Sequence, residues 1–288
     1  MPRRRQRGLA LLSVLWVSAL LATLAAGFAS DTRTESRLAR NLRENAKAEA
    51  LADAGVHHAA LHLFRLPADR PWRELATRYR LELGAGEVTV AFEDENAKVD
   101  LNYAPPALID GLIMALGAEP ELAATSAARI QDFRDPDQEP LPLGAEDEAY
   151  LAAGFEQGAK DAPFIALNEL LLVLGMSEEL YLRLLPHVTV WSGGEGVDPL
   201  RAAPEVLRAI PGIDEETVET ILGLGPDEDP YTVLDEERLF EIETFFQFSN
   251  ESVFRVISVG RSEHGGVFVR DAVIELSGGE ERPFLVLE

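Results

Sequence analysis

The chain has 288 residues, no cysteine and a formal net charge of −24, from 50 acidic and 26 basic residues. Its length allows one large domain or two moderate ones, and the lack of cysteine excludes disulfides and thiolate metal sites. An acidic chain repels phosphate backbones, so we expect no nucleic-acid partner.

The N-terminal segment combines a basic tag with an apolar run. Residues 3–16 read RRRQRGLALLSVLW, and the first thirty residues contain no acid. The uncharged segment Leu9–Ala29 has 21 residues; as a helix it would be about 31 Å long, enough to cross a bilayer core. Because basic flanks stay in the cytoplasm, we expect a single-pass membrane protein with its body after Asp31 outside the cytoplasm. In a bacterium with two membranes, the helix would cross the inner membrane and the body would lie in the periplasm.

Three interpretations of this segment stay open. A secretory signal peptide would be cleaved after Ala26 or Ala29, but the apolar core of such peptides is typically roughly 7–15 residues, shorter than this run. A plain membrane anchor would keep the whole segment. A prepilin leader would comprise residues 1–8 and be cleaved where the basic tag meets the apolar run, between Gly8 and Leu9.

A helix is predicted to follow the apolar run. Residues 31–66 contain no proline and are rich in Ala, Leu, Arg and Glu, which favour helix. Apolar side chains recur there every four positions, at Leu38, Leu42, Ala46, Ala50 and Ala54. Pro67 ends the pattern.

The apolar run and this segment can form one helix. It would extend from Leu9 to Leu66 over about 87 Å, with a transmembrane half at residues 9–29 and a periplasmic half at residues 30–66. The weak points in that stretch are Gly27 and Gly55, and the alternative is two helices joined at Gly27.

The rest of the chain alternates between strand and helix signals. Residues 67–102 and 249–288 show the period-two alternation of strands, including a predicted last strand in RPFLVLE. Residues 103–248 read as helical, apart from the strand HVTVW at 187–191. The order predicts an α+β fold in which a helical domain (103–248) is inserted into a small α+β domain (67–102 and 249–288).

Several segments carry a family resemblance. RGLALLSVLW before a long helix resembles the leader of type IV pilin-like proteins. The segments NAKVDLNYAPPALIDGLI, DFRDPDQEPLPLGAEDEAYL, VTVWSGG and APEVLRAIPGI follow in this order. Together they resemble the minor pseudopilin K family of the type II (general) secretion system, over essentially the whole chain.

The resemblance implies a fold, a processing step and partners. The fold would be a pilin-like long N-terminal helix packed on a small antiparallel sheet, with a large inserted helical (SAM-like) domain. A prepilin peptidase would cleave after Gly8, and the new N-terminus, Leu9, would be methylated. The protein would lie at the tip of a periplasmic pseudopilus, with other minor pseudopilins, the inner-membrane platform and membrane lipid as partners.

Ser13 fits a tip position. It is the fifth residue after the predicted cleavage site, where major pilin subunits usually carry glutamate. A carboxylate inside a membrane bundle needs a partner, which in pilins is the amine of the preceding subunit. A first subunit has no predecessor, and the resembled family shares this absence, although a plain anchor explains Ser13 equally well.

A run of acids is the main candidate binding site. Counted from Asp135, acids fall at positions one, three, five and twelve, as in an EF-hand loop, but Pro140 occupies the position that requires glycine. The resemblance implies calcium, one or two ions, in the helical domain. The candidate ligands are Asp135, Asp137, Glu139, Glu146 and Asp147. The alternatives are a solvated acidic loop that caps a helix at Glu146, and a weaker acidic turn at Asp227–Asp229.

The segment APEVLRAIPGIDEETVETIL (203–222) resembles a helix-hairpin-helix, a module that grips DNA backbone. Asp214, Glu215 and Glu216 follow its turn and would repel phosphate. We therefore interpret it as a SAM-like packing element.

No catalytic constellation is evident, and we expect no enzyme activity. The chain contains neither a phosphate-binding G-x-x-x-x-G-K nor a G-x-S-x-G nucleophile motif. Two functions stay open: a pseudopilus tip subunit that initiates or caps the filament for protein export, and a membrane-tethered calcium- or protein-binding module that does not assemble.

Overall fold

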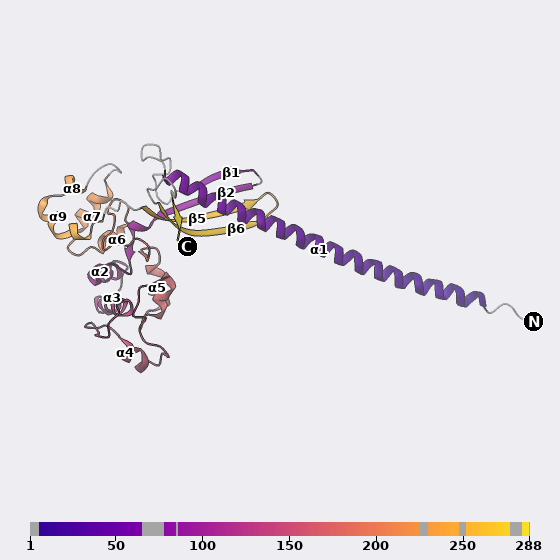
Figure 1. Cartoon of the computed structure of the whole chain (residues 1–288), viewed down its shortest axis with the longest axis horizontal. Coiled ribbons are helices and arrows are strands. Elements are labelled where there is room, and N and C mark those ends of the chain that lie inside the picture. Colours follow the sequence, from indigo (N-terminus) through magenta and orange to yellow (C-terminus); the bar gives the residue numbers. More distant parts are fainter. Residues whose placement is uncertain are drawn as a thin grey trace, which may run out of the picture. The chain divides into compact units, whose positions relative to one another are not determined.

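The computed structural model describes residues 6–64, 78–84, 86–224, 230–247, 252–276 and 284–287. Figure 1 labels α1–α9 and the strands β1, β2, β5 and β6. In chain order, a long N-terminal helix precedes two strands, a series of short helices with two short strands among them, and three further strands. This order and the antiparallel strand pairs confirm the predicted α+β class.

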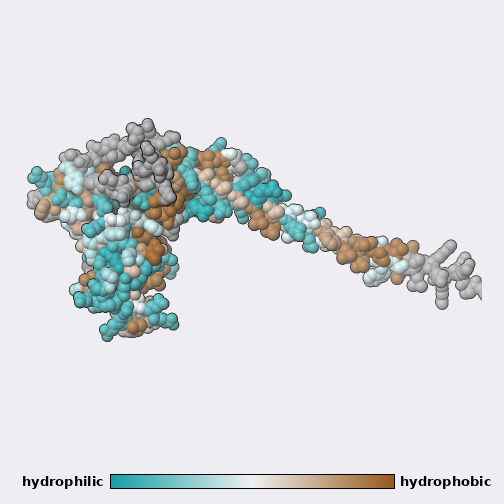
Figure 2. Space-filling model, viewed as in Figure 1, coloured by the Kyte–Doolittle hydropathy of each residue, from teal (hydrophilic) through white to brown (hydrophobic). Residues whose placement is uncertain are grey.

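The N-terminal helix, α1 (Gln6–Phe64), is continuous over 59 residues. It passes through Gly27 without a break, so the two-helix alternative is wrong. Among the described residues, α1 is the one helix that is long and apolar enough to cross a membrane. Figure 2 shows its apolar part in brown, toward the N-terminal end. The predicted end at Leu66 and Pro67 lies outside the described residues.

Five strands form one sheet in the order β1-β2-β5-β6-β7. β1 pairs antiparallel with β2, from Tyr79 opposite Val90 to Leu83 opposite Gly86, and β6 pairs antiparallel with β7. The predicted last strand is confirmed as β7. The bounds are β1 (Tyr79–Leu83), β2 (Gly86–Asp94), β5 (Ser252–Ser262), β6 (Val267–Leu276) and β7 (Leu285–Val286).

The second half of α1 lies close against the sheet because both surfaces carry small residues. A Cβ added at Gly55 would lie 2.1 Å from Ser258 Oγ, and one added at Gly260 would lie 2.1 Å from the Ala48 carbonyl oxygen. The side chains that α1 buries there are Ala48, Leu51, Ala52, Val56 and Ala59.

The predicted apolar side of α1 is wrong. The five residues that recur every four positions are exposed, namely Leu38, Leu42, Ala46, Ala50 and Ala54. A helix turns about 100° per residue, so a strict four-residue spacing drifts about 40° at each step and leaves one face within a few turns. The buried side contains Leu51 and Val56 among alanines and Gly55, and these smaller residues weaken its hydropathy signal.

Short helices fill the segment between β2 and β5. Pro106, Pro120 and Pro204 each begin a helix, at the position where the missing N–H of proline has no cost. The bounds are η2 (Glu95–Ala97), α2 (Pro106–Ala115), α3 (Pro120–Arg134), α4 (Asp147–Ala152), η3 (Leu167–Leu172), α5 (Glu178–Leu184), α6 (Pro204–Arg208), α7 (Glu215–Leu222), α8 (Pro230–Val233), α9 (Glu236–Ile242) and η4 (Glu243–Phe245).

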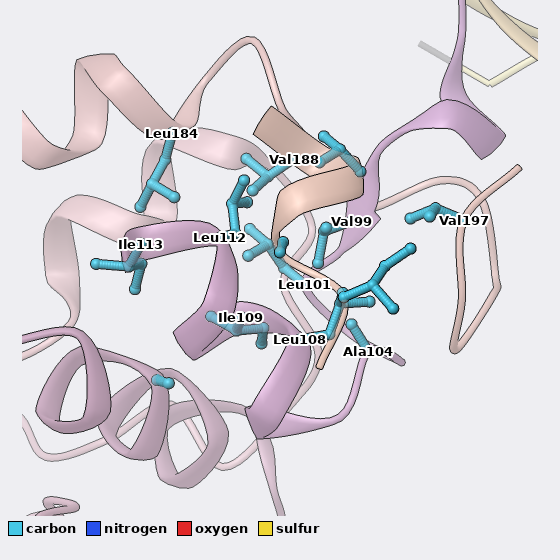
Figure 3. Close-up of a cluster of buried hydrophobic side chains, with 14 of the residues drawn as sticks. Val99, Leu101, Ala104, Leu108, Ile109, Leu112, Ile113, Leu184, Val188 and Val197 are labelled. Carbon is cyan, nitrogen blue, oxygen red and sulfur yellow. The ribbon is translucent and has the colours of Figure 1, made fainter. Parts of the chain in front are cut away.

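These helices share a core around two short parallel strands, β3 (Val99–Asp100) and β4 (Val188–Thr189). The strand predicted at 187–191 is thus present as β4. Figure 3 shows Leu101, Leu108 and Leu112 directed toward the same centre as these strands. All three side chains are fully buried, and their burial stabilises the segment that carries the acidic loop.

The chain divides into two compact units. The first holds α1 up to Ala59, β1, β2 up to Val90, and residues Ile257–Arg270. The second holds α1 from Ala60 onward, Ala91–Val256 and the chain from Asp271 onward. Because the division crosses β2, β5 and β6, it does not fix the limits of a helical insertion, and the predicted bounds 103–248 stay a prediction.

Candidate metal centre

Three acidic side chains converge between α3 and α4. Asp135, Asp137 and Glu146 each offer a carboxylate oxygen within 4.8 Å of the others. Asp135 is the residue at which the backbone leaves α3, and Glu146 precedes α4 with an extended backbone and makes no side-chain capping bond. The two helix ends thereby hold the acids of one loop together. We call Asp135, Asp137 and Glu146 the acidic triad.

Asp132 folds this loop back on itself. Its buried carboxylate accepts hydrogen bonds from the backbone N–H groups of Ala145, at 2.7 Å, and of Leu141, at 3.2 Å. Gly144 permits the approach, since a Cβ there would lie 1.9 Å from Asp132 Oδ2. Asp132 therefore sets the position of Glu146, which follows Ala145.

The triad contains buried oxygens that lack partners. Among the described residues, neither carboxylate oxygen of Glu146 has a hydrogen-bond partner, and Asp135 Oδ1 has none. Glu146 is only 5% exposed. A buried polar group without a partner costs about 1–3 kcal/mol, and more when it is charged.

The surrounding charges make this arrangement unfavourable without a counterion. Burial raises the pKa of Glu146 to about 7, and Asp132, Asp135, Asp161 and Asp137 add to the effect. The basic neighbours in sequence point elsewhere: Arg134 donates to the carbonyls of Leu101 and Ala104, and Lys160 binds Glu169. Carboxylate oxygens in such a cluster fit a hard divalent cation such as calcium.

Asp161 is a further acid near the triad, and the sequence analysis missed it. Its left-handed backbone (φ 53°) and its N–H bond to the Phe133 carbonyl place it beside the end of α3. Gln138 Nε2 donates to its Oδ2 at 2.7 Å, whereas its buried Oδ1 has no partner among the described residues. It lies 24 positions after Asp137 in a loop without a motif, so no local pattern indicated it.

Two of the five predicted ligands lie outside the triad. The backbone N–H of Glu139 donates to Asp137 Oδ1 at 2.8 Å, and this turn leaves the Glu139 side chain exposed. The first residue of α4, Asp147, has its carboxylate against Gly158, where a Cβ would lie 1.6 Å from Asp147 Oδ1. The acidic turn Asp227–Asp229 lies outside the described residues. Metal binding itself stays a prediction.

The predicted processing site lies at the start of α1. Gly8 and Leu9 are helical, and residues 1–5 of the predicted leader lie outside the described residues. Cleavage between Gly8 and Leu9 stays a prediction. The predicted helix-hairpin-helix segment forms α6 and α7, joined by a turn in which Gly212 adopts a positive φ of 84°.

Residues 90–193 match the family described as type II secretion system (T2SS), protein K. Relatives named type II secretion system protein K include one from Klebsiella pneumoniae, 31% identical over 64% of this chain and 62% of its own length. Another, from Pectobacterium carotovorum, is 31% identical over 65% and 63%. The chain thus spans about three fifths of the length of these two relatives.

A third relative, the protein K of Pseudomonas aeruginosa, is 30% identical over 76% of this chain and 72% of its own length. A chain from the crystal structure of the GspK-GspI-GspJ complex of enterotoxigenic Escherichia coli shares the fold, with a TM-score of 0.58 and 22% identity over 90% of this chain and 98% of that one. From the identity and coverage of the Pseudomonas match, this chain belongs to the type II secretion system protein K family.

Proposed function

We propose that the chain is a minor pseudopilin at the tip of the type II secretion pseudopilus, where it initiates or caps filament assembly for protein export. The observation that carries this proposal is α1, a continuous helix whose apolar first part is exposed and whose second half packs on a sheet. Such a helix can stack with sister helices in a membrane or filament. The role is structural, without a catalytic step.

Partners of the same kind follow from this role. The related Escherichia coli structure is a complex of GspK with GspI and GspJ, which supports two other minor pseudopilins as partners of this chain. The inner-membrane platform and the pseudopilus itself would contact the tip complex. Membrane lipid surrounds the apolar part of α1 before assembly.

Processing and topology complete the proposal. A prepilin peptidase removes residues 1–8, and Leu9 becomes the methylated N-terminus. The basic end of α1 stays in the cytoplasm, and the body lies in the periplasm. Ser13 needs no charged partner, as suits a subunit that nothing precedes in the filament.

The acidic triad holds calcium in this proposal. Asp135, Asp137 and Glu146 supply the oxygens, and Asp161 lies close enough to act on Glu146 by its charge. The cation would join the end of α3 to the start of α4 and remove the repulsion among the carboxylates. One or two ions can be served by this group of acids.

One observation favours a second candidate function. The acidic triad and its supporting residues all lie in the segment Ala91–Val256 of the second unit, and none comes from α1. A membrane-tethered calcium- or protein-binding module would need that unit and only a simple anchor. The two functions differ in what happens to the N-terminus.

The mass of the mature protein tests the proposal. In cells with prepilin peptidase, we expect loss of residues 1–8, one added methyl group, and co-purification with other pilin-type subunits. Gly8→Val should abolish cleavage, whereas Gly27→Val, where an added Cβ meets nothing within 4 Å, should leave it intact. An intact Met1, or a start at Gly27 or Ser30, would favour the tether or a signal peptide.

A further inference from the structure

An excess of arginine follows the apolar run directly. Between Asp31 and Arg43 there are four arginines and two acids, whereas 18 basic and 48 acidic residues follow Arg43. All four arginines lie on α1 and are exposed. A basic patch directly beside an apolar run, in a chain with an acidic balance, calls for a physical explanation.

Arg33 and Arg37 are adjacent like charges on one helix face. Residues four apart on a helix are neighbours, and such a like-charged pair is destabilising. Asp31 and Glu35 cannot relieve it, since a separation of two residues places side chains on different faces. Among the described residues, neither Arg33 nor Arg37 forms an ion pair. The pair therefore lacks an anion within this part of the chain.

A hollow lies on the same face, next to the pair. It has a volume of about 450 Å³ and is lined by Ala26, Ala29, Ser30, Arg33, Thr34 and Arg37. The small side chains come from the end of the apolar run, and the two guanidinium groups border them. Its lining is mainly polar, with the two guanidinium groups beside the small side chains of Ala26 and Ala29.

The height of the pair along α1 matches the headgroup layer of a membrane. Counted from Ala29, Arg33 lies about 6 Å and Arg37 about 12 Å along the helix axis. Helical side chains lean toward the N-terminus, here toward the membrane, and long arginines extend to the interface. A headgroup layer is about 5–7 Å thick on each side of the hydrocarbon core, so both guanidinium groups reach it.

We propose that Arg33, Arg37 and the hollow bind the phosphate headgroup of an anionic phospholipid in the leaflet that faces the body. Guanidinium groups bind phosphate oxygens in a bidentate manner, and the acyl chain would follow the small residues Ala26 and Ala29 downward. The inference rests on the membrane insertion of α1 in the proposed function. It adds a lipid preference, which a plain apolar anchor would not have.

The same face could instead meet an acidic helix of another pilin-type subunit. The height along α1 favours lipid, because phosphate is present at that level around every inserted molecule. A protein partner would have to bring a carboxylate to the same height, where negatively charged headgroups repel it.

The test measures lipid selectivity of the full chain in vesicles. The protein is reconstituted into phosphatidylcholine vesicles with traces of spin-labelled phosphatidylglycerol or phosphatidylcholine, and the motionally restricted fraction of each label is measured. We expect phosphatidylglycerol to be preferred by up to about 25-fold at low salt, because each of the two arginines contributes about a factor of five when it contacts a headgroup. Arg33→Gln with Arg37→Gln should bring the preference close to one.

Arg40→Gln with Arg43→Gln is the matched control. It removes the same charge from the same exposed helix, but about 16–21 Å beyond Ala29, where screening is strong. It should retain most of the preference. An equal loss in both variants, or no preference in the unaltered chain, would overturn the headgroup site.

Flotation of the same vesicles separates this inference from the proposed function. A chain that floats with both lipids but shows no preference overturns the headgroup site alone. A chain that floats with neither overturns the membrane role as well. Loss of co-purification with pilin-type subunits in the Arg33/Arg37 variant, with lipid preference unchanged, would assign the pair to a protein contact instead.

Discussion

Along residues 48–59 of α1, the groups that meet the sheet are backbone atoms and apolar side chains, and Gly55 and Gly260 bring them together. In the loop between α3 and α4, the buried groups are carboxylate oxygens, and those of Glu146 have no partner among the described residues. Both regions are buried, but neutral contacts stabilise the first directly. The second needs a cation, so it can respond to its surroundings.

Gly260→Val would break the first region and has the largest expected effect. Its Cβ would lie 2.1 Å from the Ala48 carbonyl oxygen and 2.6 Å from the Ala52 nitrogen, which are backbone atoms that cannot turn aside. We expect a loss of about 3 kcal/mol in the free energy of unfolding, measured by urea denaturation. Gly223→Ala is the control, since its nearest contacts are at 3.4 Å, and an equal loss there would contradict the close-contact explanation.

Calcium would sharpen the comparison by stabilising only the second region. At a calcium concentration one hundred times the dissociation constant, binding should add about 2.7 kcal/mol and raise the melting temperature. Asp135→Ala with Asp137→Ala should abolish this response and stabilise the metal-free protein, because it removes repulsion. Glu178→Ala with Glu179→Ala removes equal charge elsewhere and should keep the response; an unchanged melting temperature of the unaltered protein would remove calcium from the proposal.

The pH should change the stability of the protein through Glu146 in the same loop. The raised pKa of Glu146, about 7 against an ordinary 4.5, means that the folded state binds the proton more tightly than the unfolded state. The metal-free protein should therefore lose about 2 kcal/mol of stability as the pH rises from 4.5 to 7, and little above that. Glu146→Gln should flatten the slope in urea titrations; a slope unchanged by this substitution would assign the effect to other groups.

The smallest expected effect concerns the residues that precede two helices of the second unit, α4 and α5. Ser177 caps α5 by accepting the Leu180 N–H at 3.1 Å, whereas Glu146 precedes α4 without a capping bond. Ser177→Ala should cost about 1 kcal/mol, and Ser177→Gly only a few tenths. In the metal-free protein Glu146→Ala should cost nothing or stabilise, as measured by thermal melting, and a cost equal to that of Ser177→Ala would show that Glu146 does cap α4.

The periodicity of apolar residues in the sequence was sufficient to predict the main helices and strands. The length of α1, the alternation in β2 at Val88, Val90 and Phe92, and the short strand β4 all follow from local patterns. The buried face of α1 did not follow, since glycine and alanine pack closely but carry little hydropathy. Local sequence therefore indicated where elements form better than which surface they bury.

The candidate site was predictable only in part, because it depends on folding at a distance. Spacing indicated Asp135, Asp137 and Glu146. It could not indicate that Asp132 folds the loop back, or that Asp161 approaches from a later segment. Spacing also indicated two residues that lie outside the triad. A turn at Asp137 keeps Glu139 out of it, and the start of α4 does the same for Asp147.

The continuity of α1 has a mechanical consequence. A helix of 59 residues, about 88 Å long and without a hinge at Gly27, behaves as a stiff strut. If another subunit enters beneath such a strut and lifts its lower end by one step, the upper end rises by the same distance. Work done at the level of the membrane would then reach the far end of the helix as displacement, with little of it lost in bending.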